Sequence, residues 1–266
     1  MRNNKRKGDI QVNKKTIAIL ITCISILISR PVYAAKFTST SPHVNVILNF
    51  LSGDKTNSGG KFFIALDERE HNKRGGAILF KGSNVSGQDM LRAYYDPAYL
   101  PFVAQAAMRA MSEVDKKNYL YYQRRLAEFQ ANLDSVVSNG KHCLNIGSTK
   151  ILDLTGIEGT LIVAAHNNTI RPDKKQLKRW ASGDTASLAA MLKQEENKGT
   201  VVLVDRWTPP TVLGCLQNYS RKIAMPALET NANYFIMLSK LYRYVASRIG
   251  GSGASKKTGK KNTGEK

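Results

Sequence analysis

Four histidines are the residues of this chain best suited to metal binding or acid–base chemistry. They are His43, His71, His142 and His166, and none has a second histidine at helical spacing. The chain contains no Gly-x-Ser-x-Gly, phosphate-binding loop, Cys-x-x-Cys or His-Glu-x-x-His motif. An enzyme working near neutral pH needs an acid, base or nucleophile set, so the sequence favours a binding protein over an enzyme.

The first 34 residues predict a cleavable export signal. Met1–Lys15 is basic, Thr16–Ser29 is almost entirely apolar, and Val32–Ala34 ends in small residues suited to a signal peptidase. The apolar run is about 14 residues long, whereas a membrane span needs roughly 20. The sequence therefore predicts a periplasmic or secreted protein, with a retained anchor as the alternative.

Two cysteines follow the signal, Cys143 and Cys215. In an oxidising compartment such a pair forms a disulfide or remains as two free thiols. The sequence leaves both states open.

The chain is strongly basic, with a formal net charge of +20. The signal accounts for seven basic residues and one acidic residue, so about +14 remains after cleavage. Such a charge favours solubility, and it also attracts anionic polymers or an envelope partner. The sequence shows no specific nucleic-acid-binding motif.

The segment that follows the signal is short of helix. Val44–Leu51 predicts a short helix, and Lys61–Leu66 and Ala77–Lys81 predict strands. Asp54–Gly60 and Glu68–Gly76 are predicted loops because of their glycine, polar and charged residues.

Helical periodicity begins after Asp96 and continues to Val137. Asp115 falls between two helical stretches, so we expect one long helix with a break or two helices in line.

Strand and helix patterns alternate from Cys143 onward, which predicts a parallel sheet covered on both faces. The predicted strands are Cys143–Ile146, Thr160–Ala164, Thr200–Val204 and Lys222–Met225. The predicted helices are Thr149–Thr155, Asp173–Ala181, Thr185–Asn197, Pro209–Asn218 and Asn231–Ile249.

Three segments of the chain resemble the zinc- and manganese-binding solute receptors of bacterial ABC importers. They are Asp96–Asp134, which contains an Asp-Pro turn and a Tyr-rich helix, then Ile170–Asp173, and Val201–Pro209. The resemblance covers roughly residues 38–249. It implies a two-lobe α/β fold of the periplasmic-binding-protein type, with parallel sheets and a long helix spanning the lobes.

The resemblance implies the boundaries of the two lobes and of the inter-lobe helix, whereas the signal and the tail follow from composition. Residues 1–34 are the signal, 35–92 a shortened N-terminal lobe and 93–140 the inter-lobe helix. Residues 141–249 form the C-terminal lobe, and 250–266 a disordered basic tail.

Members of that family hold their metal ion with four residues, two from each lobe. Their positions fall here at His71, at Arg92, at Asn145 and at Glu229. Arg92 and Asn145 depart from the family's ligands, since a guanidinium cannot deprotonate to bind zinc. His142 lies three residues from Asn145, and His166 could also face the cleft, so a second possible ligand set is His71, His142 or His166, and Glu229.

Two functions remain open. The first is a monomeric receptor that binds zinc or manganese and passes it to an ABC permease. The second is an envelope interaction protein that keeps the fold, binds no ion and uses its basic surface for a polyanion or protein partner. In the second case Arg92 would pair with Glu229 and take over the metal's role of holding the lobes together.

Overall fold

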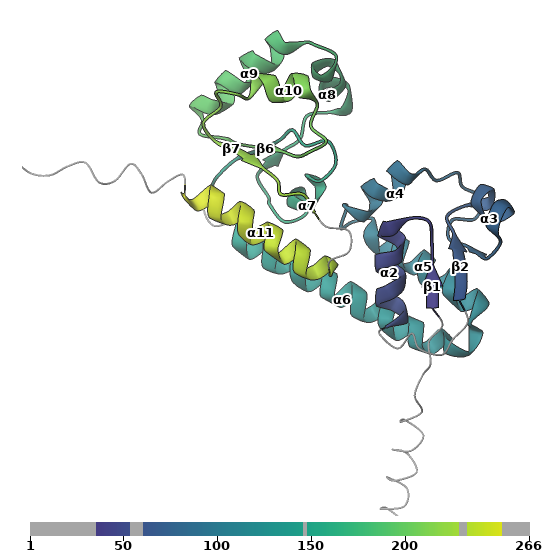
Figure 1. Cartoon of the computed structure of the whole chain (residues 1–266). Helices are drawn as coiled ribbons and strands as arrows, with labels where there is room; N and C mark the ends of the chain where they lie inside the picture. Colours follow the sequence, from purple (N-terminus) through teal and green to yellow (C-terminus); the bar gives the residue numbers. More distant parts are fainter. Residues whose placement is uncertain (1–35, 54–60, 146–147, 229–232, 252–266) are drawn as a thin grey trace, which may run out of the picture. The chain divides into compact units, whose positions relative to one another are not determined.

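The computed structural model describes residues 36–53, 61–145, 148–228 and 233–251 (Figure 1). The predicted signal and residues 252–266 of the predicted tail lie outside these ranges. Within the described ranges, no helix is both long and apolar enough to cross a membrane.

The first lobe contains a parallel sheet of three strands in the order β1-β2-β3. The strands are β1 (Lys36–Thr38), β2 (Lys61–Ala65) and β3 (Ala77–Ile78). Three helices belong to this lobe, α2 (Pro42–Ser52), α3 (Glu68–Arg74) and α4 (Gly87–Tyr94). Parallel neighbours need crossover connections, and α2 and α3 lie in those connections.

Helix α2 starts where its sequence dictates. The Ser41 hydroxyl accepts a hydrogen bond from the Val44 N–H at 3.4 Å, and Pro42 occupies the first turn. The apolar residues Val44, Ile47, Leu48 and Leu51 recur on one face and are all buried. Because His43 directly precedes Val44, this packing also fixes the position of His43.

The longest helix, α6 (Tyr119–Leu144), has 26 residues. It follows α5 (Leu100–Val114) and a 3-10 turn, η1 (Lys116–Asn118). The predicted break at Asp115 is confirmed, because buried Asp115 lies between α5 and η1 and accepts a 2.6 Å hydrogen bond from the Tyr122 hydroxyl. The final helix, α11 (Tyr234–Gly251), packs along α6 (Figure 1).

The second lobe contains a parallel sheet of four strands in the order β5-β4-β6-β7. The strands are β4 (Ile151–Asp153), β5 (Thr169–Ile170), β6 (Val201–Val204) and β7 (Lys222–Ala224). The helices of this lobe are α7 (Thr160–Val163), α8 (Lys174–Ala181), α9 (Thr185–Asn197) and α10 (Pro210–Cys215).

Strand β6 is buried on both faces, as its continuous apolar sequence predicts. Val201 and Leu203 belong to a large core that also contains residues of the first lobe, α6 and α11. Val202 and Val204 face the opposite way, into a smaller core around Trp180. The predicted α/β fold with two parallel sheets and a long helix is confirmed.

Three element predictions near the start of the second lobe are wrong. Cys143 and Leu144 end α6 and do not begin a strand, because Leu144 continues the buried face of that helix. The predicted helix Thr149–Thr155 contains β4, and the predicted strand Thr160–Ala164 contains α7. The β-branched residues of α7 favour a strand, but the preceding loop fixes a helical turn.

The predicted loop Glu68–Gly76 is also wrong, since it contains α3. Asp67 caps this helix by accepting a 3.1 Å hydrogen bond from the Glu70 N–H. The prediction also lacked α4, which begins with a capping box between Ser86 and Asp89. Both helices are short and polar, so their caps were the main signal in the sequence.

Candidate functional site

The structure does not gather the histidines that the sequence suggested as metal ligands. His71 is half-buried on α3, and His142 is exposed on α6. His166 is buried after α7, where its Nδ1 lies 2.9 Å from the Thr169 hydroxyl. Among the described residues, no group of three or more His, Cys, Asp or Glu side chains could hold a metal ion. Glu229 lies outside the described residues.

The two positions that depart from the family's ligands have other roles here. Arg92 is exposed in the last turn of α4, where its charge helps to lower the pKa of Asp89 after the hydrogen bonds from Ser86. Asn145 directly follows α6 and therefore does not end a strand. Its amide donates a 2.9 Å hydrogen bond to the Ala165 carbonyl oxygen and its carbonyl accepts one of 3.0 Å from the Asn167 N–H.

The two cysteines are both free and half-buried. Cys143 lies on α6 and Cys215 on α10. The structure therefore favours the free thiols over the disulfide.

A different set of polar side chains meets between the lobes, and we call it the interlobe cluster. Its members are His43, Tyr94, Tyr95, Glu158, Arg206 and Tyr234. The first three come from α2 and the end of α4, and the others from the loop before α7, the loop after β6 and the start of α11. The Thr160 hydroxyl joins the lobes nearby by donating a 2.6 Å hydrogen bond to the Tyr95 carbonyl oxygen.

Aromatic contacts fix the first-lobe side of this cluster. The His43 ring lies 4.8 Å from the Tyr94 ring and 6.0 Å from the Tyr95 ring. Tyr94 also packs edge-to-face on Tyr95 at 5.3 Å and on Tyr234 at 5.0 Å. Since the three tyrosines are at most 2% exposed, the packing holds His43 in one place.

Asp205 fixes the second-lobe side. Its carboxylate accepts hydrogen bonds of 2.9–3.0 Å from the three main-chain N–H groups of Gly156–Glu158. It also accepts from the Trp207 N–H and the Thr208 hydroxyl, both at 3.0 Å. Gly156 is required here, because a Cβ atom would lie 2.5 Å from the Trp207 carbonyl oxygen. Asp205 therefore ties the loop that carries Glu158 to the loop that carries Arg206.

Glu158 and Arg206 form a loose ion pair. Arg206 Nε lies 3.6 Å from Glu158 Oε1, a distance too long for a hydrogen bond. The Glu158 side chain is 1% exposed and the Arg206 side chain 44% exposed. The guanidinium also lies 5.0 Å from the centre of the Trp207 ring.

Buried polar atoms without a hydrogen-bond partner concentrate in the interlobe cluster. Ten such side-chain atoms occur in the described part of the chain, and six belong to the cluster. They are His43 Nε2, both Glu158 carboxylate oxygens and the hydroxyls of Tyr94, Tyr95 and Tyr234. Unpartnered buried polar groups are costly, so their concentration here indicates a site for a ligand.

Burial and charge shift the pKa values of the cluster. Burial, followed by the charge of Arg206, lowers the pKa of His43, so its imidazole is neutral at pH 7. Burial and the Asp205 carboxylate raise the pKa of Glu158 to about 7, against the opposing effect of Arg206. Burial and the Glu158 charge raise the pKa of Tyr95, and Arg206 opposes this as well. A neutral imidazole and a carboxyl group that ionises near pH 7 are both able to bind a cation.

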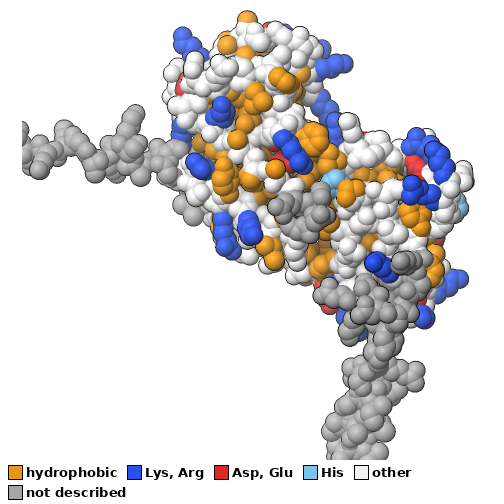
Figure 2. Space-filling model, viewed as in Figure 1, with side chains coloured by type: hydrophobic (Ala, Val, Ile, Leu, Met, Phe, Trp, Pro, Cys, Tyr) orange, Lys and Arg blue, Asp and Glu red, His pale blue; other side chains and the backbone are white. Residues whose placement is uncertain are grey.

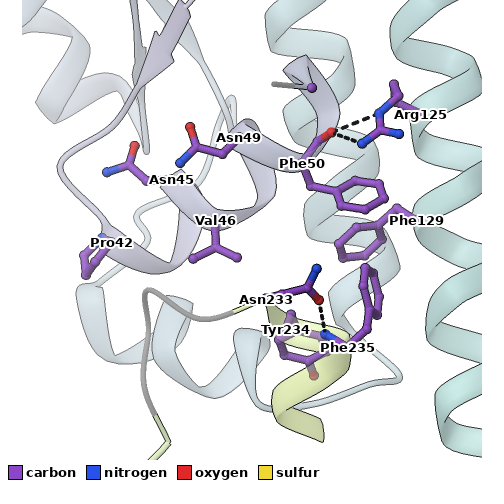
Figure 3. A pocket seen from close by; sticks show the side chains of 11 residues that line it. Pro42, Asn45, Val46, Asn49, Phe50, Arg125, Phe129, Asn233, Tyr234 and Phe235 are labelled. Carbon is purple, nitrogen blue, oxygen red and sulfur yellow. Dashed lines mark hydrogen bonds between the residues drawn. The ribbon is translucent and has the colours of Figure 1, made fainter. Parts of the chain in front are cut away.

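A pocket of about 580 Å³, which Tyr234 of the interlobe cluster also lines, opens between α2, α6 and the start of α11 (Figure 3). Phe50, Phe129 and Phe235 form one wall, with ring centres 5.2–5.5 Å apart. Arg125 stacks on Phe50 at 4.3 Å and donates hydrogen bonds of 3.1 and 2.8 Å to its carbonyl oxygen. Because these bonds and an ion pair with Glu128 occupy the guanidinium, the pocket offers less unpartnered polar chemistry than the interlobe cluster.

Lysine and arginine side chains are scattered over the face shown in Figure 2 and do not gather into one patch there. On this face the basic charge is a general property of the surface.

Sequence reasoning missed His43, Glu158 and Arg206 as site residues. His43 is a lone histidine in an apolar helix pattern, and Glu158 has no motif around it. Arg206 had one usable signal, because it closely follows β6 and ligands of parallel α/β sheets bind beyond the carboxyl ends of the strands.

Comparison with known proteins identifies the fold. No protein-family model and no curated protein matches the sequence. Among solved structures, ZnuA is 12% identical, covers 81% of this chain and 99% of its own, and has a TM-score of 0.54. A zinc-bound variant of AdcAII from Streptococcus pneumoniae is 10% identical, with 82% and 100% covered and a TM-score of 0.54. FpvC from Pseudomonas aeruginosa, in complex with Mn²⁺, is 13% identical, with 83% and 99% covered and a TM-score of 0.50.

At these identities the likeness concerns the fold. The chain has the two-lobe fold of the metal-binding solute-binding proteins.

Proposed function

We propose that this protein is an extracytoplasmic solute receptor that binds a divalent ion, zinc or manganese, between its lobes and passes it to an ABC permease. The interlobe cluster carries the proposal, because both lobes contribute to it buried polar atoms that lack a hydrogen-bond partner within the described residues. The predicted export signal supports a location outside the cytoplasm.

The donors we assign are His43 Nε2 from the first lobe and the Glu158 carboxylate from the second. Both groups are buried and lack a hydrogen-bond partner within the described residues. Neutral imidazole nitrogen and carboxylate oxygen are ordinary ligands of zinc. An ion held by one donor from each lobe would stabilise the closed arrangement, which is the form that a permease could recognise.

Two protein donors are fewer than the three or four of a tight zinc site. We therefore expect 1:1 binding that is weaker than that of a complete site. Glu229 remains a prediction from the resemblance as a further donor.

The test is a titration of the purified protein with Zn²⁺ and with Mn²⁺ by isothermal calorimetry. We expect 1:1 binding of at least one ion and a loss of about tenfold or more in affinity in His43→Ala. The matched control is His142→Ala, since His142 is exposed on α6. Absence of binding of both ions, or binding that depends on His142 and not on His43, would overturn the proposal.

A further inference from the structure

Arg206 places a positive charge in the interlobe cluster, and this charge would repel a divalent ion. The two loops tied by Asp205 place its guanidinium beside Glu158. The Glu158 side chain has almost no contact with solvent, so the charge nearest to its carboxylate decides what else can bind there.

Glu158 differs from Asp205, the neighbouring carboxylate. Asp205 accepts five hydrogen bonds and has no capacity left for a ligand. Both oxygens of Glu158 lack a hydrogen bond, and the 3.6 Å approach of Arg206 supplies charge without a close contact. Of these two carboxylates, only Glu158 can change its partner without dismantling the loops.

The charge of Arg206 also reaches the first lobe. Burial lowers the pKa of His43 most, and the charge of Arg206 lowers it further. The same charge lowers the pKa of Tyr95, against the effect of Glu158, which raises it. The guanidinium is therefore within electrostatic range of both donors that we assign to the ion. Since nearly half of the Arg206 side chain is exposed, it can swing into solvent.

We propose that Arg206 sets the ligand specificity of the interlobe cluster, because its guanidinium holds the place beside Glu158 that a divalent ion would take. A divalent ion binds only by displacing this tethered cation, so Arg206 lowers the affinity for bare ions. The inference rests on the proposed function, since it concerns the same two donors.

A second buried carboxylate offers a matched control. Asp153 is fully buried, and Arg171 Nε lies 3.5 Å from its Oδ2. The geometry of this pair resembles that of Arg206 and Glu158, but Asp153 Oδ1 accepts 2.9 and 2.6 Å hydrogen bonds from the N–H and hydroxyl of Thr155. Arg171→Gln therefore removes a comparable charge from a carboxylate to which we assign no ligand.

The experiment compares zinc affinities by competition with a colorimetric chelator, with circular dichroism to confirm folding. We expect Arg206→Gln to bind zinc about tenfold more tightly than the wild type. Arg206→His should bind more tightly still, because it adds an imidazole donor. Arg206→Lys, which keeps a cation, and Arg171→Gln should bind as the wild type does.

A rescue measurement covers the case in which the Arg206→Gln or Arg206→His protein does not fold. In Arg206→Ala, added methylguanidinium should compete with zinc, whereas it should leave zinc binding by the wild type unchanged.

The outcomes separate the two proposals. Zinc binding by the wild type with no gain in any folded Arg206 variant would overturn the role of Arg206 and leave the receptor function standing. Binding by Arg206→Gln but not by the wild type would support the role of Arg206 and overturn the proposed function. Binding by Arg206→His alone would reflect only the added imidazole and would overturn both. No binding in any of these proteins would overturn both, and an equal gain in Arg171→Gln would overturn the specific role of Arg206.

Discussion

The Thr160 hydroxyl donates a 2.6 Å hydrogen bond to the main-chain carbonyl oxygen of Tyr95, and so ties the first turn of α7 in the second lobe to the end of α4 in the first. Tyr95 is fully buried, so the bond connects the lobes beside the interlobe cluster.

Thr160→Val should destabilise the protein by about 1–3 kcal/mol, because it leaves a buried carbonyl oxygen without its partner while keeping the side-chain shape. Thr160→Ser keeps the hydroxyl and should cost less. The free energy of unfolding in urea measures both. Equal stability of Thr160→Val and the wild type would show that the bond does not contribute.

Gly140 allows α6 and α11 to pack closely. A Cβ atom at Gly140 would lie 2.4 Å from the ring of Tyr242, which is held in place by a 3.1 Å hydrogen bond to the Leu161 carbonyl oxygen. Alanine favours a helix by about 1 kcal/mol over glycine, but overpacking costs about 1–3 kcal/mol. Because the Tyr242 ring cannot move freely, we expect Gly140→Ala to be destabilising overall.

The control for that variant is Gly214→Ala in α10. Apart from its chain neighbours and its own helix backbone, no atom lies within 4 Å of a Cβ built at Gly214. The helix preference should therefore dominate, and stability should rise by up to about 1 kcal/mol. Thermal unfolding of both variants measures these changes in stability. A rise in stability for Gly140→Ala would contradict the close packing of α6 and α11.

Asp205→Asn tests the connection between the loops that carry Glu158 and Arg206. An amide has one accepting oxygen where the carboxylate has two, so some of the N–H groups of Gly156–Glu158 would lose their partner. We expect a loss of about 2 kcal/mol in the free energy of unfolding. Asp173→Asn makes the same change at the exposed cap of α8, where asparagine is an equally good cap. It should therefore be nearly neutral, and equal losses in the two variants would contradict the role of Asp205.

Glu195 should make stability depend on acidic pH. Burial alone would raise its pKa, but hydrogen bonds from Lys198, Lys150 and Thr200 lower it from the ordinary 4.5 to about 2. An acid with a lowered pKa stabilises the fold above its unfolded-state value, and this contribution is lost as the pH falls from about 4.5 towards 2.

The stability difference between the wild type and Glu195→Gln should therefore shrink by on the order of 2 kcal/mol across that range. Urea unfolding at several pH values measures it. Glu113→Gln is the control, because the exposed pair that Glu113 forms with Lys81 at 2.7 Å should contribute little. A difference that does not change with pH would contradict the assignment.

The sequence was a good guide where one local pattern decided the structure. The buried strand β6 and the capped helices α8 and α9 were predicted because apolar runs and Asp caps act locally. Helix α7 was mistaken for a strand because its β-branched residues favour a strand. The helical turn is fixed instead by the hydrogen bonds that Asp205, 47–49 positions away in sequence, accepts from the preceding loop.

The site was harder to predict than the fold. The resemblance suggested His71, and His166 was added because it could face the cleft, but the structure does not gather them into a metal site within the described residues. His43 and Glu158 belong to one cluster only through tertiary packing. The expectation that an arginine would pair with a glutamate between the lobes named Arg92 and Glu229. Glu229 lies outside the described residues, so that pair stays a prediction. The pair of Arg206 and Glu158 is a different one, because both of its residues belong to the second lobe.

The most direct measurement is anomalous X-ray scattering at the zinc edge from crystals of the protein grown with zinc. The proposed function predicts one main peak at about 2.0–2.2 Å from His43 Nε2 and from a Glu158 carboxylate oxygen, with the Arg206 guanidinium moved away from Glu158. A main peak at His71, His142 or His166, or no bound zinc at all in crystals of protein that has been saturated with the ion, would contradict it.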